Sequence, residues 1–279
     1  MYGISNYSFG MVAAAACLLA TFIAARWPTR AGRAAALGLL VAVLVVIGVP
    51  IFGSDVGGII AFTPTILVFG VLVTGYRVRI RTVVIGLLAT VAAVGAFGML
   101  DLARPPGERA HLGRLFERVG NEGLEPLLSI MERKLLANLG VTTSSFWVAV
   151  IPMAVAFLVF LSRYPSRPMA RLREQIPTLR AGVVASIVAA VLGSAVNDSG
   201  AIVGGVTLFV LVASLAWLAL DATALAATEQ AGRAGDDAEK GSEPGASAAT
   251  GRTRRPTAGA VETQAIASAR GASAGSEPS

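Results

Sequence analysis

The stretch Tyr76–Leu100, YRVRIRTVVIGLLATVAAVGAFGML, decides the fold. Three arginines, Arg77, Arg79 and Arg81, come directly before an apolar run, Thr82–Leu100, that carries no charge. A bilayer-spanning helix needs about 20 apolar residues, and this run is close to that length. Arginines on one flank of such a run are typical of a transmembrane helix whose basic end stays in the cytoplasm.

Six further apolar runs of similar length occur along the chain. Together they predict an all-α integral membrane protein with about seven transmembrane helices. The predicted spans are Tyr7–Ala25, Ala34–Phe52, Gly57–Tyr76, Thr82–Leu100, Ser144–Ser162, Ala181–Val196 and Ala201–Leu220.

Arginine is concentrated in every second gap between these spans. The three arginine-rich gaps hold eleven arginines and one acid, Glu174. Arginine is enriched in cytoplasmic loops, so these gaps are predicted to lie inside the cell. The remaining segments hold six basic and eight acidic residues and are predicted to lie outside; they are residues 53–56, 101–143 and 197–200. Seven spans then give an N-outside, C-inside topology.

The composition points to the same class of protein. Hydrophobic residues make up 54% of the chain and charged residues 14%, with a mean hydropathy of +0.69. A soluble domain of this length would carry roughly a quarter charged residues. The net charge of +6 does not indicate nucleic acid, because the arginines lie beside apolar ends, where they meet lipid headgroups. The lipid bilayer is the expected partner, and the heavy use of Ala, Gly and Arg suggests a bacterial cell (plasma) membrane.

The chain is predicted to divide after residue 221. Residues 1–221 form the polytopic membrane domain, which includes an outer insert at residues 101–143. Residues 222–279 form a predicted disordered cytoplasmic tail, because they lack the runs of large apolar residues that would offset the entropy of ordering.

The outer insert is predicted to contain two amphipathic helices. Pro105 and Pro106 stop the fourth span before the insert begins. Two sets of apolar residues then recur at helical spacing; they are Leu112, Leu115, Phe116 and Val119, and Leu124, Leu127, Leu128, Met131, Leu135 and Leu139. Such helices would either lie along the outer membrane interface or cap the bundle.

Polar residues of the outer segments form a candidate site. Asp198 is the one charged residue between Arg180 and Asp221, and its turn is either a plain connection or a functional carboxylate paired with Arg104, Arg109 or Arg114. The single histidine, His111, is either a proton carrier or a structural residue at a helix start. The candidate outer-face polar cluster is Asp55, Asp101, Arg104, His111, Arg114, Asn197 and Asp198.

No metal or cofactor is expected at this cluster. Cys17 is the single cysteine and lies in an apolar run, and one histidine with scattered carboxylates is a poor zinc ligand set. The chain contains no phosphate-binding loop, nucleophile elbow or zinc-protease motif. Pro64 lies between two threonines inside the third predicted span, where a kink is expected.

Several short motifs carry a resemblance. They are Asp101-Leu-Ala-Arg104, His111-Leu-Gly-Arg114, Asn121-Glu-Gly123, Glu132-Arg133-Lys134, Asn138 and Asn197-Asp198-Ser199-Gly200. On the basis of these motifs, residues 50–220 resemble the membrane-embedded C-terminal portion of large bacterial proteins of unassigned function. Some of those proteins carry an alkaline-phosphatase-like extracytoplasmic domain. The resemblance implies that this chain is a stand-alone version or a fragment, and it assigns no catalytic residue here.

Three functions are compatible with the sequence. The first is a non-catalytic membrane module that supports cell-envelope processes, with an extracytoplasmic enzyme domain or another membrane protein as partner. The second is an outer-leaflet enzyme acting on a phosphorylated lipid or glycan, in which Arg104 and Arg114 hold phosphate and His111 or Asp198 moves a proton. The third is a small transporter or lipid translocator that uses Asp55 and Asp198, although the predicted spans hold almost no ionisable residue. The lack of a catalytic motif favours the first.

Overall fold

A computed structural model of the protein describes residues 4–163 and 167–241, and this part of the chain is helical, without strands. The predicted all-α fold is therefore confirmed. The helices are α1 (Asn6–Arg26), α2 (Arg30–Gly48), α3 (Val56–Val73), α4 (Ile80–Leu102), α5 (His111–Glu122), α6 (Glu125–Ser144), α7 (Trp147–Arg163), α8 (Arg167–Gln175), α9 (Leu179–Val196) and α10 (Ala201–Gly241). A short 3-10 turn, Pro106–Glu108, lies between α4 and α5.

Six of the described helices are long and apolar enough to cross a membrane: α1, α2, α3, α4, α9 and α10. The count reaches seven if α6 and α7 are taken as one broken span, since they meet at a bend of 76°. The fifth predicted span corresponds to α7, which has only 17 residues. The other six predicted spans each coincide with one long helix to within a few residues at their starts.

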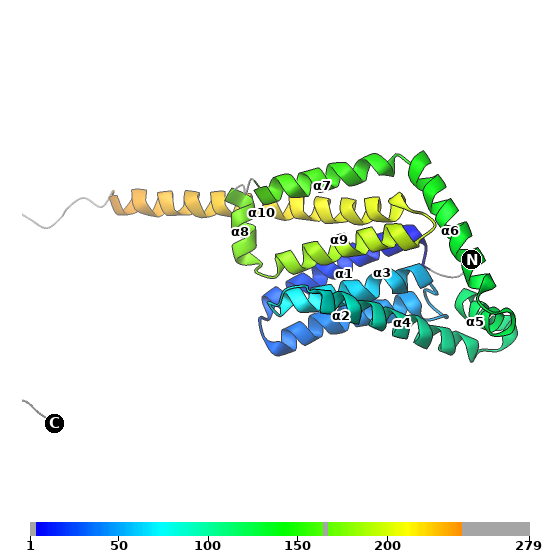
Figure 1. Ribbon diagram of the computed structural model, residues 1–279. Coiled ribbons are helices and arrows are strands. Elements are labelled where there is room, and N and C mark those ends of the chain that lie inside the picture. The colour runs from blue at the N-terminus through cyan, green and yellow to red at the C-terminus, as the bar shows by residue number, and fades with distance from the viewer. Residues whose placement is uncertain (1–3, 164–166, 242–279) are drawn as a thin grey trace, which may run out of the picture. The chain divides into compact units, whose positions relative to one another are not determined.

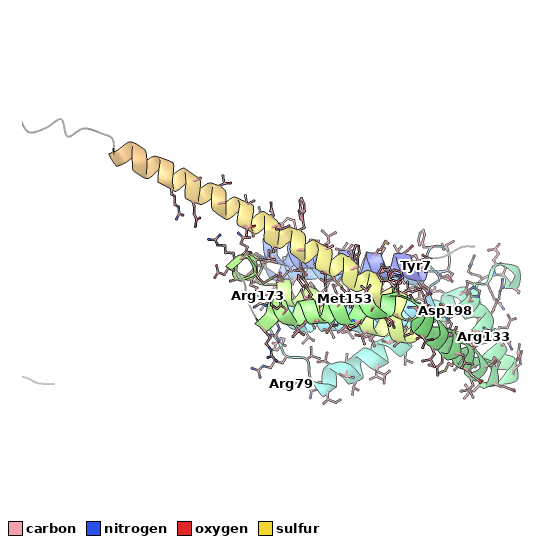
Figure 2. All side chains as sticks on the ribbon, turned by 90° about the horizontal axis from the view of Figure 1, so that it is seen from above. Tyr7, Arg79, Arg133, Met153, Arg173 and Asp198 are labelled. Atoms are coloured by element: carbon pink, nitrogen blue, oxygen red, sulfur yellow. The ribbon has the colours of Figure 1, made fainter. Side chains whose placement is uncertain are left out.

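The long helices run along a common direction, with α6 across one end and α8 across the other (Figure 1). We call the first the insert end; it holds the turns at residues 49–55 and 197–200 together with α5 and α6. The second is the arginine-rich end. Figure 2 shows Arg79 and Arg173 at the arginine-rich end and Arg133 and Asp198 at the insert end. The two kinds of gap seen in the sequence therefore lie at opposite ends of the bundle.

Side chains cap the first three helices where the sequence turns from polar to apolar. Ser5, Thr29 and Asp55 each accept a hydrogen bond from the backbone N–H three residues on, at Ser8, Gly32 and Gly58. Such caps satisfy backbone donors that the first turn of a helix leaves without a partner. They fix where each helix begins and so set the ends of the bundle.

Small residues bring α1 and α9 close together at the centre of the bundle. Cys17, Ala13 and Ala20 of α1 and Ala185 and Ala189 of α9 are buried in one cluster with parts of α2 and α3. Helices in lipid associate through close packing of small residues rather than through a hydrophobic driving force. A second cluster joins α1 and α9 to α7, α8 and α10. Helices α1 and α9 are thus shared by both halves of the core.

Helix α3 carries Pro64 in its interior. The hydroxyl groups of Thr63 and Thr65 donate to the carbonyl oxygens of Ile59 and Ala61, each at 2.8 Å. These carbonyls flank that of Ile60, which loses its usual N–H donor because proline has none. The two threonine hydroxyls therefore add hydrogen bonds on either side of the one that Pro64 removes, as hydroxyl groups do in membrane helices.

Two parts of the structure were not expected from the sequence. Helix α8 lies in an arginine-rich gap, and it buries Met169 and Leu172 in the second core cluster. Helix α10 continues beyond residue 221, so residues 222–241 of the predicted tail are helical. Their alanines favour helix more than any other residue type does. A second structural unit, residues 232–279, is described only as far as Gly241; the rest of the predicted tail lies outside the described residues.

Candidate functional site

The seven residues of the candidate cluster fall into two groups at the insert end. Asp55, Asn197 and Asp198 lie where the start of α3 meets the α9–α10 turn, which in turn contacts α6. Asp101, Arg104, His111 and Arg114 lie at the corner between α4 and α5. Within the described residues, no hydrogen bond or ion pair connects the first group to the second.

Asp55 caps α3 with one carboxylate oxygen and leaves the other without a partner. Its Oδ1 atom accepts a hydrogen bond from Gly58 N at 2.9 Å. Its Oδ2 atom is buried and has no hydrogen-bond partner. The preceding residue, Ser54, has a positive φ of 49°, so the backbone turns sharply into the cap.

The α9–α10 turn lies against the start of α3. Asn197 is 2% exposed, and its side-chain amide donates to Gly193 O at 3.0 Å. Its side-chain oxygen occupies the space that a Cβ at Gly57 would fill, so only glycine allows this approach. Gly200 ends the turn with φ +49°, a left-handed conformation that glycine adopts without strain.

One face of α6 holds this turn in place. Lys134, Asn138 and Thr142 are spaced four residues apart, so they lie along one side of the helix. The Asn138 amide donates to Ser194 O at 2.5 Å and to Asn197 O at 2.6 Å. The Thr142 hydroxyl accepts from Ala201 N at 3.2 Å. These bonds fasten α6 across the ends of α9 and α10.

Asp198 is exposed and joins α1 to α6. It accepts a hydrogen bond from the Asn6 amide at 2.6 Å and pairs with Lys134 Nζ at 3.9 Å. The pairing with Arg104, Arg109 or Arg114 that the sequence suggested is wrong. Arg104 and Arg109 are held by acids at the α4–α5 corner, whereas α6 carries Lys134 to Asp198.

The environment of Asp55 raises the pKa of its carboxyl. Burial raises the pKa of the Asp55 carboxyl above its ordinary value of 3.8. The hydrogen bond from Gly58 and the positive charge of Lys134 work against this rise, and the negative charge of Asp198 adds to it. Asp55, Lys134 and Asp198 are thus coupled through their charges.

Asp101 ties α5 to the end of α4. The residue is fully buried, although it is a carboxylate. Its Oδ1 atom accepts from Ala110 N at 3.0 Å, and its Oδ2 atom accepts from Gly113 N at 2.7 Å. These are backbone donors at the start of α5, where helices bind negative groups well. Gly113 is required here because a Cβ would come within 2.8 Å of Asp101 Oδ2.

Two cations of this corner, Arg104 and Arg109, form ion pairs with nearby acids. Arg104 pairs with Asp101 at 3.4 Å and with Glu108 at 3.7 Å. Arg109 pairs with Glu117 at 2.9 Å. These contacts fold the α4–α5 connection onto itself.

His111 and Arg114 lie on the outside of this corner. His111 is the first residue of α5, and both side chains are exposed. His111 and Arg114 are therefore not part of the buried site around Asp101.

Sequence reasoning missed the residues that assemble the first group. Asn6, Lys134, Asn138, Thr142 and Ser199 make its hydrogen bonds and its ion pair. The four-residue spacing of Lys134, Asn138 and Thr142 was a readable signal for a polar helix face. Its target was not readable, because it comes from a turn some 60 residues further along the chain.

The chemistry of both groups is mainly that of structural ties. Most of the polar atoms bond to backbone groups or to one another within the insert end. Among the described residues, no three His, Cys, Asp or Glu side chains are placed to share a metal ion. The exception is the second oxygen of Asp55, which is buried and lacks a partner.

The apolar face of α6 is exposed beside its polar face. Five side chains on this face, which we call the α6 stripe, are each more than half exposed: Leu124, Leu128, Met131, Leu135 and Leu139. An exposed apolar face next to membrane helices marks contact with lipid or with another protein.

Comparisons with protein-family profiles, with curated protein sequences and with solved structures found no match to this chain.

Proposed function

We propose that this chain is a non-catalytic membrane module that supports cell-envelope processes in a bacterial cell membrane. Its N-terminus lies outside the cell, and helices α5 and α6 form a platform on the outer surface. The α6 stripe rests in the outer membrane interface, and the charged side of α5 faces an extracytoplasmic enzyme domain or another membrane protein. The distribution of arginine supports this orientation.

The observation behind this proposal is that the polar side chains of the insert end form hydrogen bonds within the protein itself. Asp101 forms hydrogen bonds with backbone groups at the start of α5. Asn138 on α6 forms hydrogen bonds with backbone groups at the end of α9. A catalytic or transport group would instead direct its polar atoms toward a substrate. The charged residues of α5 remain exposed beside these ties; they are Arg114, Glu117, Arg118 and Glu122. A rigidly fixed platform with an exposed charged face suits recognition of a partner.

Site-specific crosslinking in intact cells tests the proposal. A photoreactive side chain at Arg118 on α5 is expected to crosslink one defined partner protein. The matched control position is Leu88 on α4, which is exposed on an apolar helix and should crosslink lipid only. Asn138→Ala should lower the crosslinking yield from Arg118, because it releases α6 from the turn. A chain that isolates alone, with no crosslink from any position on α5, would overturn the proposal.

A second function, a small ion-coupled transporter, is supported by Asp55 alone. A half-buried carboxyl with a raised pKa and one buried oxygen without a partner has the properties of a group that binds and releases protons. It caps the helix that contains Pro64. Proton flux in liposomes reconstituted with purified protein, compared with Asp55→Asn, tests this function. Equal flux in the two proteins would reject the coupling role of Asp55.

A further inference from the structure

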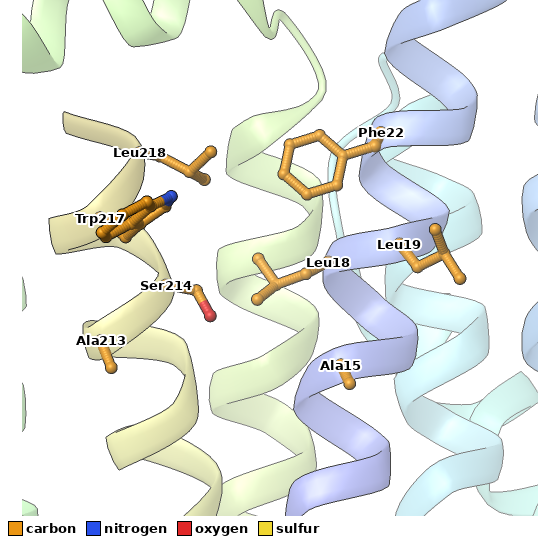
Figure 3. Close-up of a pocket in the computed structure, with 8 residues that line it drawn as sticks. All are labelled: Ala15, Leu18, Leu19, Phe22, Ala213, Ser214, Trp217 and Leu218. Atoms are coloured by element: carbon orange, nitrogen blue, oxygen red, sulfur yellow. The ribbon is translucent and has the colours of Figure 1, made fainter. Parts of the chain in front are cut away.

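An apolar groove runs between α1 and α10 in the half of the bundle nearer the arginine-rich end. It has a volume of about 520 Å³, which is within the range of roughly 300–1,000 Å³ of ligand sites. Figure 3 shows Leu18 and Phe22 of α1 facing Ser214 and Leu218 of α10 across it. Trp217 forms the outer edge and is 72% exposed.

The groove opens where headgroups meet the protein. Trp217 and Trp27 are both exposed near the arginine-rich end, and tryptophan is enriched at the level of lipid headgroups. Arg26 follows Phe22 by four residues, so it lies on the same side of α1, one turn closer to that end. Asp221 likewise follows Trp217 by four residues, so it lies on the same side of α10 and adds a negative charge there. The arginine-rich gaps nevertheless carry eleven arginines against Glu174, so a negative headgroup is favoured there.

A bilayer fills such a groove with hydrocarbon. Its lining is apolar apart from Ser214 and the indole N–H of Trp217, and the groove is open rather than enclosed. An acyl chain packs against leucine and phenylalanine side chains through dispersion contacts that an empty groove would forfeit. An indole N–H beside the headgroup provides a donor for a polar lipid atom.

We propose that this groove is a binding site for one anionic phospholipid. An acyl chain lies between Leu18, Phe22 and Leu218, and the headgroup meets Arg26. The site is at the opposite end of the bundle from α5 and α6, so the inference does not depend on the proposed function.

Quenching of tryptophan fluorescence by brominated lipids tests the site. The chain has three tryptophans, so Trp27→Phe with Trp147→Phe leaves Trp217 as the single reporter. The purified protein is reconstituted in phosphatidylcholine vesicles that hold a small, equal fraction of brominated phosphatidylglycerol or brominated phosphatidylcholine. Brominated phosphatidylglycerol should quench Trp217 with about fivefold higher relative affinity, the ratio that one arginine near the headgroups provides.

Three variants separate the groove from the bulk lipid. Arg26→Gln should bring the two affinities together, and Ser214→Leu, which fills the groove, should lower quenching by both lipids. A protein whose single tryptophan is placed by Leu88→Trp on exposed α4 should respond equally to both. Circular dichroism and gel filtration confirm that each variant is folded.

Equal quenching of Trp217 by the two lipids, or a preference that Arg26→Gln leaves unchanged, would overturn the proposal. So would protection of Trp217 from both lipids, because a second protein helix would then occupy the groove.

Discussion

Asp101 shows how a single buried carboxylate can determine the position of a helix. Both of its oxygens accept backbone N–H groups from the start of α5, and Arg104 balances its charge at 3.4 Å. A buried charge is stable only when it is paired and hydrogen-bonded, as this one is. The residue therefore belongs to the architecture of the insert end, and its removal should loosen α5 first.

We predict that Asp101→Asn destabilises α5. The asparagine side chain has one accepting oxygen, so one of the donors at Ala110 and Gly113 loses its partner, at a cost of about 1–3 kcal/mol. Hydrogen exchange of the α5 amides in detergent micelles should become faster, while exchange in α3 stays the same. Arg114→Gln, at an exposed position of the same helix, is the control. Unchanged exchange in α5 would contradict this role.

Asp55 gives the protein a pH-dependent stability. Folding raises the pKa of Asp55 above 3.8. Between pH 3.8 and the raised pKa, the native state therefore keeps a proton that the unfolded chain has released. Stability therefore falls as pH rises from 3.8 through the raised value and stays lower above it. Asparagine cannot ionise and is an equally good helix cap.

Asp55→Asn should therefore raise the melting temperature at about pH 8 and leave it nearly unchanged at about pH 4. Thermal unfolding followed by circular dichroism measures both. Asp198→Asn is the matched control, because Asp198 is exposed and its ion pair with Lys134 at 3.9 Å contributes little. A stabilisation of equal size at both pH values would show that the raised pKa of Asp55 is not the cause.

Among the site residues, the sequence predicted the type of group better than its partners. Asp55, Asn197 and Asp198 could be selected because they are polar residues in turns between apolar runs. The role of Lys134 could not, since it depends on which face of α6 meets a turn distant in the chain. Asp101 was selected as a member of the outer-face polar cluster, and only the fold shows that it is fully buried and holds the start of α5.

At the scale of helices, α9 packs closely against α1 in the core of the bundle. A Cβ at Gly182 would overlap the hydroxyl of Thr21 and come within 3.3 Å of Cys17 O. The backbones of the two helices therefore approach each other at a glycine, as membrane helices do at small residues.

We predict that Gly182→Ala lowers the stability of the bundle by about 1–3 kcal/mol, because the extra methyl group forces α1 and α9 apart. Gly38→Ala in α2 is the matched control, since no atom lies within 4 Å of its added Cβ. The control should be neutral or stabilise by about 0.5–1 kcal/mol, because alanine favours helix. Unfolding in increasing fractions of a denaturing detergent measures both, and equal effects would refute the packing argument.

The positions of the helices could be predicted because their signals are local. Apolar length and flanking arginines both lie within one segment of sequence, and they placed α1, α3 and α4 within a few residues. Helix α8 was missed because its apolar residues, Met169 and Leu172, are few and surrounded by arginines. The bend between α6 and α7 lies at the predicted boundary between the outer insert, residues 101–143, and the fifth span.

On the scale of the whole molecule, charge separates the two ends of the bundle. The three arginine-rich gaps lie together at the end that carries Arg79 and Arg173, and the insert lies at the other (Figure 2). The fold alone does not distinguish the inside of the cell from the outside. Only the preference of arginine for the cytoplasm does so, and from it we propose that the insert end lies outside.

Cysteine labelling of intact cells tests this orientation. Cys17 is the one native cysteine and is buried, and Cys17→Ala removes any background from it. A membrane-impermeant maleimide should then label Glu122→Cys on α5 from outside. It should label Val78→Cys in the α3–α4 turn only after lysis, although both positions are exposed. The reverse pattern would place α5 and α6 in the cytoplasm, where they could not meet an extracytoplasmic partner. The proposed function would then fail, whereas the lipid site between α1 and α10 would remain to be judged by its own measurement.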